Sequence, residues 1–358
     1  MSCDTCQNTL TLPAEKGTLY FMSQIQELTE KSFKFLEQIS KNIKSENGIV
    51  SVELSNIYDF FHHHIELIKS TFNEMECEEI KLSIRKDGEN FDFQTIINAK
   101  PLQRFINRFE DQDFFDIVNN ESLTSHFQPI VSMESNEIFA YEILTRGVYK
   151  DGSLMYPDTL FSKSTRNDLN FKLDRLCREN ALKTAATKKV KQKVFINFIP
   201  TAIYDPQFCL KSTEQWAKQL HYDPSQIVFE VVETELVQDQ KHLVKILQYY
   251  KSKGFMIALD DVGEGYSSLN MLIELQPDII KIDRNIIDGI DKNSLKKSVY
   301  SALWSIAKEN NIKVLAEGVE TQEEYDLIRS IGADYAQGYF FAKPNAEPVR
   351  QLSCQLTH

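Results

Sequence analysis

The strongest constraint on the fold is a regular alternation that begins near residue 120. Short β-rich runs recur there, and six of the gaps between them are long enough to hold a helix. The runs are FQPIV, IFAYEIL, KVFINF, IVFEVV, MIALDD, DIIKID, IKVLAEG and YAQGYFF. Strands that alternate with helices predict a parallel sheet. Eight such strands are most economically closed into a (β/α)₈ barrel of the TIM type.

One gap departs from this pattern. Only the residues SMESNE separate the first run from the second. A parallel crossover needs a dozen or more residues, so the two runs are expected to form an antiparallel hairpin. The sequence therefore predicts a TIM-like α/β barrel whose first strand is antiparallel.

The chain before residue 120 has a different character. GTLYF, GIVSVEL and EIKLSIR are expected strands, and residues 23–43 and 56–72 carry apolar residues at helical spacing. We expect a small α/β domain over residues 1–118, followed by the barrel over 119–358. The sequence does not define the role of the first domain, for which a sensory or a regulatory function is open. The amphipathic segment 100–120 is expected to form a connecting helix.

Composition limits the class of protein. Hydrophobic residues make up 42% of the chain and charged residues 26%, which is ordinary for a soluble globular protein. No apolar run approaches the roughly 20 residues of a membrane-spanning helix, and the N-terminus lacks the features of a signal peptide. We therefore expect a cytoplasmic protein without membrane insertion. The net charge of −12 argues against binding to polymeric nucleic acid.

Cysteine usage leaves one question open. Six cysteines are scattered along the chain, and only Cys3 and Cys6 have the C-x-x-C spacing. This pair is compatible with half of a zinc site, with a redox pair, or with two free thiols in an exposed tail.

Seven of the eight expected barrel strands carry a polar residue at or near their C-terminal end. The residues are Glu142, Asn197, Glu230, Asp260, Asp261, Lys281, Asp283, Glu317 and Gln337. In a (β/α)₈ barrel those strand ends form one rim, where the active sites of this fold lie. A single polar residue would be an ordinary strand terminus, but a set of them on one rim predicts a functional site.

The carboxylates on this rim require a countercharge. Five of them in one mouth cannot all stay ionised unless cations lie among them. Carboxylate oxygens with an Asn amide suit Mg²⁺ or Mn²⁺, and the adjacent Asp260 and Asp261 suit a pair of ions. Two such ions would support displacement at a phosphoryl group, and Lys281 is expected to stay protonated among the acids.

Residues 121–345 resemble the EAL-domain cyclic-di-GMP phosphodiesterases. The resemblance lies in ordered blocks: QPIV, YEILTR in place of the signature Glu-Ala-Leu-x-Arg, NF, FEVVETE, LDDVGEGYSSL, KIDR, AEGVET and AQGYFFAKP. It covers about two thirds of the chain. No GGDEF-type cyclase signature occurs in the N-terminal part.

The resemblance implies roles for individual residues. The implied ligands of two Mg²⁺ or Mn²⁺ ions are Glu142, Asn197, Glu230, Asp260 and Asp261. Lys281 is implied to orient or deprotonate the attacking water, and Glu317 and Gln337 are implied to hold the second metal site and its water. Glu233 is implied to anchor the loop that follows Asp261. The implied substrate-binding residues are Gln128, Arg146 and Asp283.

The implied reaction is hydrolysis of cyclic di-GMP to linear pGpG, in a protein that pairs into a homodimer through the EAL domain. The chain departs from the family at Ile143, Val262 and Glu264, and these changes put the rate in question. Two alternatives stay open. One is a non-catalytic cyclic-di-GMP receptor that signals through its N-terminal domain, and the other is an inert scaffold that keeps only the fold.

Overall fold

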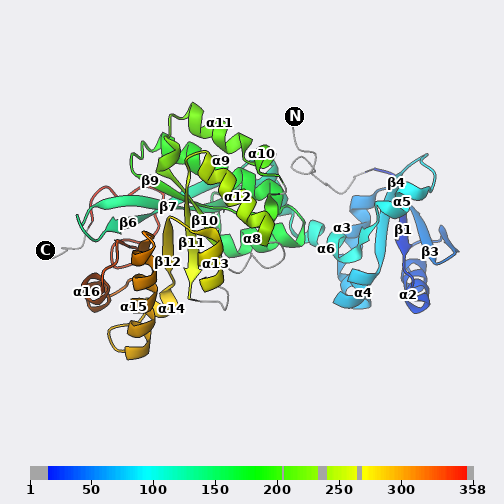
Figure 1. Cartoon of the computed structure of the whole chain (residues 1–358). Coiled ribbons are helices and arrows are strands. Elements are labelled where there is room, and N and C mark those ends of the chain that lie inside the picture. The colour runs from blue at the N-terminus through cyan, green and yellow to red at the C-terminus, as the bar shows by residue number, and fades with distance from the viewer. Residues whose placement is uncertain (1–14, 204, 233–239, 264–267, 353–358) are drawn as a thin grey trace. The chain divides into compact units, whose positions relative to one another are not determined.

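The computed structural model describes residues 15–203, 205–232, 240–263 and 268–352 (Figure 1). Their contacts divide the chain into two compact units. Among the described residues, the N-terminal unit comprises 15–119 together with 162–169. The barrel unit comprises 120–161 and 170–352.

The N-terminal unit is built on a five-stranded antiparallel sheet with the order β2-β3-β1-β4-β5. Its strands are β1 (Gly17–Met22), β2 (Ile43–Glu46), β3 (Ile49–Leu54), β4 (Lys81–Lys86) and β5 (Lys100–Pro101). Its helices are α2 (Gln26–Glu37), α3 (Ile57–Thr71), α4 (Glu74–Glu79), α5 (Phe93–Ile97), α6 (Leu102–Glu110) and α7 (Gln112–Asn119). The expected small α/β fold is confirmed, with two short edge strands that the sequence pattern did not indicate.

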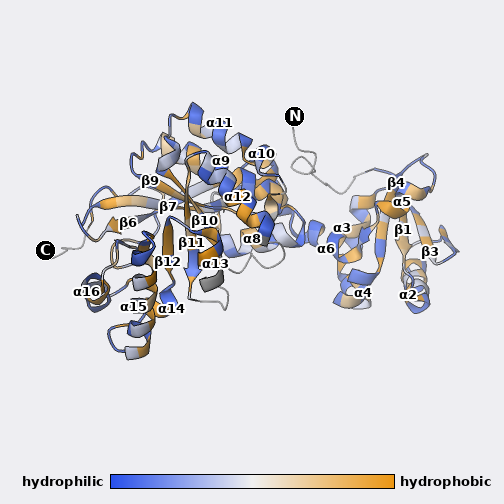
Figure 2. Cartoon of the chain, in the orientation of Figure 1, coloured by the Kyte–Doolittle hydropathy of each residue, from blue (hydrophilic) through white to orange (hydrophobic). Residues whose placement is uncertain are grey.

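One face of this sheet forms the core of the unit. Side chains alternate between the two faces of a strand, and the buried set on β1 includes Leu19 and Phe21, while that on β3 is Val50 and Val52. They pack with apolar residues of α2, α3, α4 and α6. Figure 2 shows the resulting pattern, with apolar residues along the strands and mixed colouring along the helices.

The barrel unit has eight strands that close into a ring in the order β6-β14-β13-β12-β11-β10-β9-β7, where β7 also pairs with β6. The strands are β6 (Leu123–Ser132), β7 (Ile138–Val148), β9 (Lys193–Asn197), β10 (Ile227–Val232), β11 (Met256–Val262), β12 (Ile279–Ile282), β13 (Lys313–Ala316) and β14 (Tyr335–Ala336). A two-residue strand, β8 (Leu154–Met155), pairs with the C-terminal end of β7. The predicted TIM-like barrel is confirmed.

Helices connect most of the barrel strands. They are α8 (Pro157–Arg166), α9 (Asn170–Thr187), α10 (Pro206–Cys209), α11 (Lys211–Gln219), α12 (Gln240–Ser252), α13 (Ser268–Leu275), α14 (Arg284–Ile287), α15 (Ser294–Glu309) and α16 (Gln322–Ile331). Within the described ranges, no helix is both long enough and apolar enough to cross a bilayer.

The first barrel strand is antiparallel, as predicted. β6 pairs with β7 from Leu123↔Gly147 to Val131↔Ile138, and it is also antiparallel to β14. The remaining neighbours in the ring are parallel. The short connection between the first two strands thus sets the direction of β6, and the other strands point their C-terminal ends to one rim.

The segment 100–120 differs from the single connecting helix that its pattern predicts. It forms α6 and α7, which meet at Asp111. The Asp111 carboxylate is fully buried and accepts hydrogen bonds from Arg166 Nε and Asn167 Nδ2, each at 2.7 Å. Lys163 Nζ lies 3.3 Å from the other oxygen. The hydrogen bond that Arg166 donates to Asp111 also raises the pKa of Arg166. A buried acid with this many donors fixes residues 162–169 within the N-terminal unit.

Replacement of Asp111 by Ala is expected to destabilise the N-terminal unit by about 2 kcal/mol. The variant leaves charged and amide donors without the acceptor that compensates their burial, and hydrogen bonds to charged groups contribute on this scale. Urea unfolding followed by far-ultraviolet circular dichroism measures the change.

Asp113→Ala is the matched control. Asp113 pairs with Lys163 at 2.7 Å, but 36% of its side chain is exposed to solvent. Its loss is expected to cost less than about 1 kcal/mol. Equal destabilisation by the two variants would contradict the role given to Asp111.

Candidate active site

The floor of the barrel interior is one apolar layer. Seven barrel strands each contribute one fully buried residue to it, and Tyr335 of β14 packs against it partly buried. The buried residues are Ile130, Ala140, Phe195, Val228, Ala258, Ile279 and Leu315. The layer closes the barrel and leaves the next layer of inward-facing side chains at the rim.

That next layer contains the predicted polar residues. Strand side chains alternate with a period of two, so a residue two positions further along a strand faces the same way. Nearer the rim, Ala140 is thus followed by Glu142, Val228 by Glu230 and Ile279 by Lys281, all facing the barrel interior. The same spacing relates the other members of the floor to Gln128, Asn197, Asp260, Glu317 and Gln337. Strand alternation therefore accounts for the convergence of these side chains.

The structure places each described site residue as follows. Gln128 lies on β6, Glu142 and Arg146 on β7, Asn197 on β9, Glu230 on β10, Asp260 and Asp261 on β11, Lys281 on β12, and Asp283, Glu317 and Gln337 in the loops after β12, β13 and β14. Glu233, expected to anchor the loop after Asp261, lies outside the described residues, as do Glu264 and the pair Cys3 and Cys6.

Asp261 reaches the rim through an irregularity in β11. Regular alternation would turn Asp260 and Asp261 to opposite faces of the sheet. The pairing of β11 with β12 shifts between Leu259 and Val262, and Asp261 has a left-handed backbone with φ 56°. Such a bulge redirects a side chain. As a result, carboxylate oxygens of Asp260, Asp261 and Glu317 all lie within 4.8 Å of one another.

Lys281 supplies the positive charge at the centre of the rim. Its Nζ lies 2.6 Å from Glu230 Oε1, 3.0 Å from Asp260 Oδ1 and 2.9 Å from Glu317 Oε1. Only 1% of Lys281 and none of Glu230 is exposed. Although burial disfavours the ammonium form, the surrounding carboxylates raise the pKa of Lys281 well above its usual value. Lys281 is therefore a cation at neutral pH.

The acids around Lys281 are held at the cost of desolvation. Burial raises the pKa of Glu230 and of Glu317 well above the usual value, and the ammonium of Lys281 opposes that effect. One ammonium cannot neutralise three close carboxylates, so the cluster still favours additional positive charge.

Glu142 is oriented by two amides. Asn197 Nδ2 donates to Glu142 Oε1 at 3.2 Å, and Gln337 Nε2 donates to Oε2 at 2.6 Å. Gly338 follows Gln337 at a point where a Cβ atom would overlap the backbone of Val319, so only glycine fits. The loop after β14 is thereby packed closely enough to deliver Gln337 to Glu142.

The donor set fits hard divalent cations. Neither oxygen of Glu230 accepts a hydrogen bond of regular geometry from the described residues, despite the close approach of Lys281. The buried Oε1 of Gln337 likewise has no partner among them. Buried oxygens of this kind, next to three clustered carboxylates, match the oxygen coordination of Mg²⁺ or Mn²⁺.

The predicted substrate-binding residues are only partly brought together. A cavity of about 190 Å³ opens at the rim and is lined by Gln128, Glu142, Asp283, Glu317 and Gln337, among others. Asp283 also accepts a hydrogen bond from Asn285 N at 2.8 Å and caps α14. Arg146 does not line this cavity. It is 7% exposed, donates to Thr145 O at 2.9 Å, and lies 5.4 Å from the Tyr156 ring.

Five cavity residues were not predicted from the sequence, and two of them, Gly318 and Gly338, are glycines. Arg284 and Glu320 line the cavity and form an ion pair at 2.7 Å, and Tyr339 lies beside them with 51% of its surface exposed. Each directly follows or lies close to a predicted site residue in the chain. Position in the loops after the strands was thus the available signal.

The fold and the rim define a class: a (β/α)₈-type barrel with an acidic mouth whose oxygen donors suit divalent cations. Residues 111–344 match the EAL domain family. Because the match spans well over half of the chain, the protein belongs to the EAL domain family, as the resemblance in its sequence implied.

Two relatives of this protein from Escherichia coli (strain K12) illustrate the similarity. The probable cyclic di-GMP phosphodiesterase PdeB is 31% identical over 235 residues, which are 64% of this chain and 44% of PdeB. The cyclic di-GMP phosphodiesterase PdeF is 30% identical over 63% of this chain and 31% of PdeF. The chain thus spans less than half the length of these relatives.

A solved structure matches more completely. The cyclic-di-GMP-bound form of a standalone EAL protein from Vibrio cholerae O395 is 37% identical, with a TM-score of 0.59. The match covers 64% of this chain and 95% of the other protein.

Replacement of Lys281 by Met is expected to destabilise the barrel by about 3 kcal/mol in EDTA. The variant removes the ammonium from between buried carboxylates, and breaking a buried ion pair costs on this scale. Saturating Mg²⁺ or Mn²⁺ should stabilise the variant more than the parent, because the ion then supplies the missing charge. Tryptophan fluorescence during urea unfolding is the measurement, since Trp216 and Trp304 both lie in the barrel unit.

Lys292→Met is the control. The Lys292 side chain is 83% exposed and its ion pair with Asp291, at 3.7 Å, contributes little. If Lys281→Met unfolds like Lys292→Met in EDTA, the central role of the ammonium group is wrong.

Proposed function

We propose that the protein hydrolyses cyclic di-GMP to linear pGpG with the help of two divalent metal ions. The observation that carries this proposal is the carboxylate cluster of Asp260, Asp261 and Glu317, whose oxygens lie within 4.8 Å of one another beside a protonated Lys281. Its similarity to cyclic di-GMP phosphodiesterases supports the choice of substrate.

Five residues would hold the ions: Glu142, Asn197, Glu230, Asp260 and Asp261. When bound, two divalent ions stabilise the charge on the attacking and leaving oxygens of a phosphodiester. Glu317 and Gln337 extend the set of oxygen donors toward the cavity. Asn197 and Gln337 also fix the direction of the Glu142 carboxylate, so they contribute even where they do not touch a metal.

Lys281 acts as a donor in this proposal. The surrounding carboxylates raise the pKa of Lys281, which favours a donor role for its ammonium group. It orients the attacking water and stabilises negative charge as the P–O bond to the 3′ oxygen breaks. The water oxygen forms the new P–O bond, and one proton of the water ends on the departing 3′ oxygen. The product therefore carries a 5′-phosphate and a 3′-hydroxyl, and the second phosphodiester stays intact.

Substrate contacts fall to residues around the cavity. Gln128 and Asp283 line it directly, and Asp283 is held in place by its bond to Asn285. Arg146 lies on the same strand as Glu142, four residues further on, and its planar guanidinium suits paired phosphate oxygens. Its buried Nε has no partner among the described residues, which leaves a donor for such a ligand.

The alternative function is a receptor that binds cyclic di-GMP without cleaving it. A binding-only domain has no need to keep an ammonium within 3.0 Å of three carboxylates, because that arrangement carries a desolvation cost. The full set of acids and Lys281 therefore favours the enzyme. Ile143 and Val262 are both buried apolar residues, so these departures from the family pattern remove no polar group from the rim.

The roles of the two parts of the chain, the cellular location and the oligomeric state are also proposals. We propose a sensory or regulatory role for residues 1–118 and phosphodiesterase activity for residues 119–358, of which 162–169 pack with the N-terminal unit. We also place the activity in the cytoplasm. We also propose a homodimer that forms through the helix after β11, where Ile273 of α13 is 71% exposed. A monomeric mass in light scattering at all concentrations would contradict the dimer.

The purified chain of residues 1–358 is expected to convert cyclic di-GMP to pGpG in Mg²⁺ or Mn²⁺, as measured by chromatography of the products. Excess EDTA should abolish the reaction and either ion should restore it. Ca²⁺ should bind but support little turnover, because its larger and more variable shell relaxes the geometry. Binding of cyclic di-GMP without any pGpG would favour the receptor, and undiminished activity in EDTA would exclude the metal mechanism.

Two variants separate chemistry from binding. Glu142→Ala is expected to abolish turnover and to weaken metal binding, because it removes a proposed ligand. Lys281→Ala should reduce turnover at least a hundredfold, an estimate based on the loss of one preorganised donor, while substrate still binds. Glu323→Ala, an exposed position on α16, is the control and should retain the parent rate. Parent-like hydrolysis by Lys281→Ala would refute the role of the lysine.

A further inference from the structure

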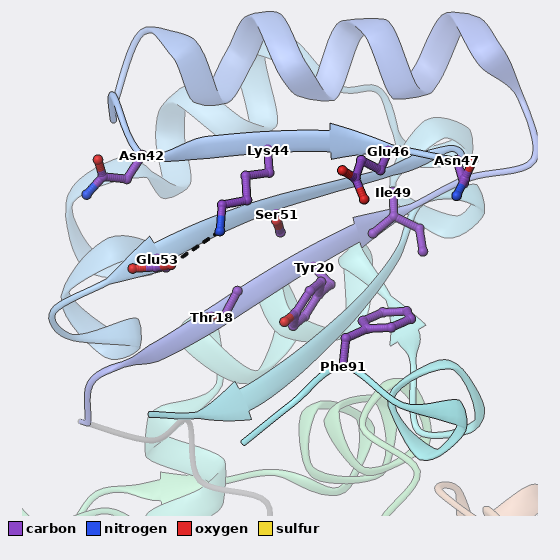
Figure 3. A pocket seen from close by; sticks show the side chains of 10 residues that line it. All are labelled: Thr18, Tyr20, Asn42, Lys44, Glu46, Asn47, Ile49, Ser51, Glu53 and Phe91. Atoms are coloured by element: carbon purple, nitrogen blue, oxygen red, sulfur yellow. Dashed lines mark ion pairs between the residues drawn. The ribbon is translucent and has the colours of Figure 1, made fainter. Parts of the chain in front are cut away.

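The second face of the N-terminal sheet carries a pocket that the proposed phosphodiesterase reaction does not use (Figure 3). Its volume is about 350 Å³, within the range of roughly 300–1,000 Å³ for small-molecule sites. The lining residues come from β1, β2 and β3, from the two ends of β2, and from the chain just before α5.

Strand register explains why these residues share one face. Thr18 and Tyr20 alternate with the buried Leu19 and Phe21, so they project away from the apolar core. Tyr20 lies opposite Ser51 of β3, and Ser51 in turn lies opposite Lys44 of β2.

The same register places acids at both ends of this row. Glu53 lies opposite Thr18, and Glu46 lies opposite Ile49. Hydroxyl, carboxylate and ammonium groups therefore form a polar row on the sheet surface, with Asn42 and Asn47 at its ends (Figure 3).

One wall of the pocket is aromatic. The rings of Tyr20 and Phe91 pack at 5.0 Å between centroids, with an interplanar angle of 55°. Phe91 is 39% exposed although it is a large apolar residue. An exposed aromatic pair beside hydroxyl and amide groups is suited to a flat ring whose edge carries hydrogen-bonding groups.

The charges of the pocket exclude one class of ligand. Its lining contains one lysine, Lys44, and two glutamates, Glu46 and Glu53. Lys44 Nζ lies 4.0 Å from Glu53, and both side chains are more than half exposed, so their ion pair is weak. A phosphate or carboxylate ligand would meet an excess of negative charge here, whereas a neutral or cationic ligand would not.

We propose that this pocket binds a small planar heteroaromatic compound that carries hydrogen-bond donors and no negative charge. The ring packs on Tyr20 and Phe91. Its donors are accepted by Glu46, Glu53 and the hydroxyl of Ser51. This site is independent of the barrel rim and of the reaction proposed for it.

The test uses the chain of residues 1–358 and two matched pairs of probes. Adenosine and adenosine monophosphate share one ring, and tryptamine and indole-3-acetate share another, so each pair differs chiefly in charge. Titration calorimetry is expected to detect one-to-one binding of adenosine, tryptamine or both. The anionic member of a binding pair should bind at least tenfold more weakly. Absence of binding by both adenosine and tryptamine, or equal binding within a pair, would overturn the proposal.

Tyr20→Leu locates the site. This variant removes the ring but keeps an apolar side chain. The affinity for the probe that binds should fall by about tenfold, on the scale of aromatic stacking. Tyr58→Leu, on α3 of the same unit and outside the pocket, should bind like the parent. Unchanged binding by a folded Tyr20→Leu protein would place the probe elsewhere and overturn the proposal.

Glu53→Lys tests the charge argument without risk to the fold, because Glu53 is an exposed residue on the strand surface. The substitution should weaken the binding of tryptamine and strengthen the binding of adenosine monophosphate. Glu66→Lys makes the same change of charge on α3, where the side chain is 86% exposed, and should alter neither. Equal effects of the two substitutions would mean that overall charge, and not this pocket, selects the ligand.

Discussion

Three carboxylates share the ammonium group of Lys281, and the electrostatics of the whole rim follow from that arrangement. Acids on neighbouring strands repel one another, and burial disfavours the ionised form of a carboxylate. The ammonium reduces this cost but cannot remove it, because the acids outnumber it. The protein thus folds with a rim that is stable enough to form and still short of positive charge, which is the condition that a cation-binding site requires.

The barrel floor gives this rim its rigidity. Eight of the rim side chains lie two residues from a member of the apolar layer or, for Gln337, from Tyr335 beside it, so their backbone is held by a packed strand. Asp261 differs from the other clustered acids, because it depends on the irregular pairing of β11 and on a left-handed backbone at that residue. Aspartate tolerates such a backbone better than most residues, so the position suits its side chain in conformation as well as in charge.

Much of this architecture could be predicted from the sequence. Strand runs and gap lengths are local signals, and they indicated the barrel, the antiparallel β6 and the polar rim. The bulge at Asp261 and the break at Asp111 could not be predicted in this way. The first depends on strand pairing, and the second on donors such as Arg166 that lie far along the chain. The edge strand β2 was missed for a simpler reason: IKSE has one apolar residue and no alternation.

Residues 162–169 have a consequence for the modularity of the protein. The chain leaves the N-terminal unit after residue 119, returns to it at 162, and leaves it again after 169. No single cut therefore separates the two units, and a cut at 119 would divide Asp111 from Arg166 and Asn167. The match to the EAL domain family begins at Asp111 itself. An EAL domain that is to be moved to another protein would have to begin no later than Asp111. An exchange of N-terminal units therefore requires a junction within the residues that the contacts assign to the N-terminal unit.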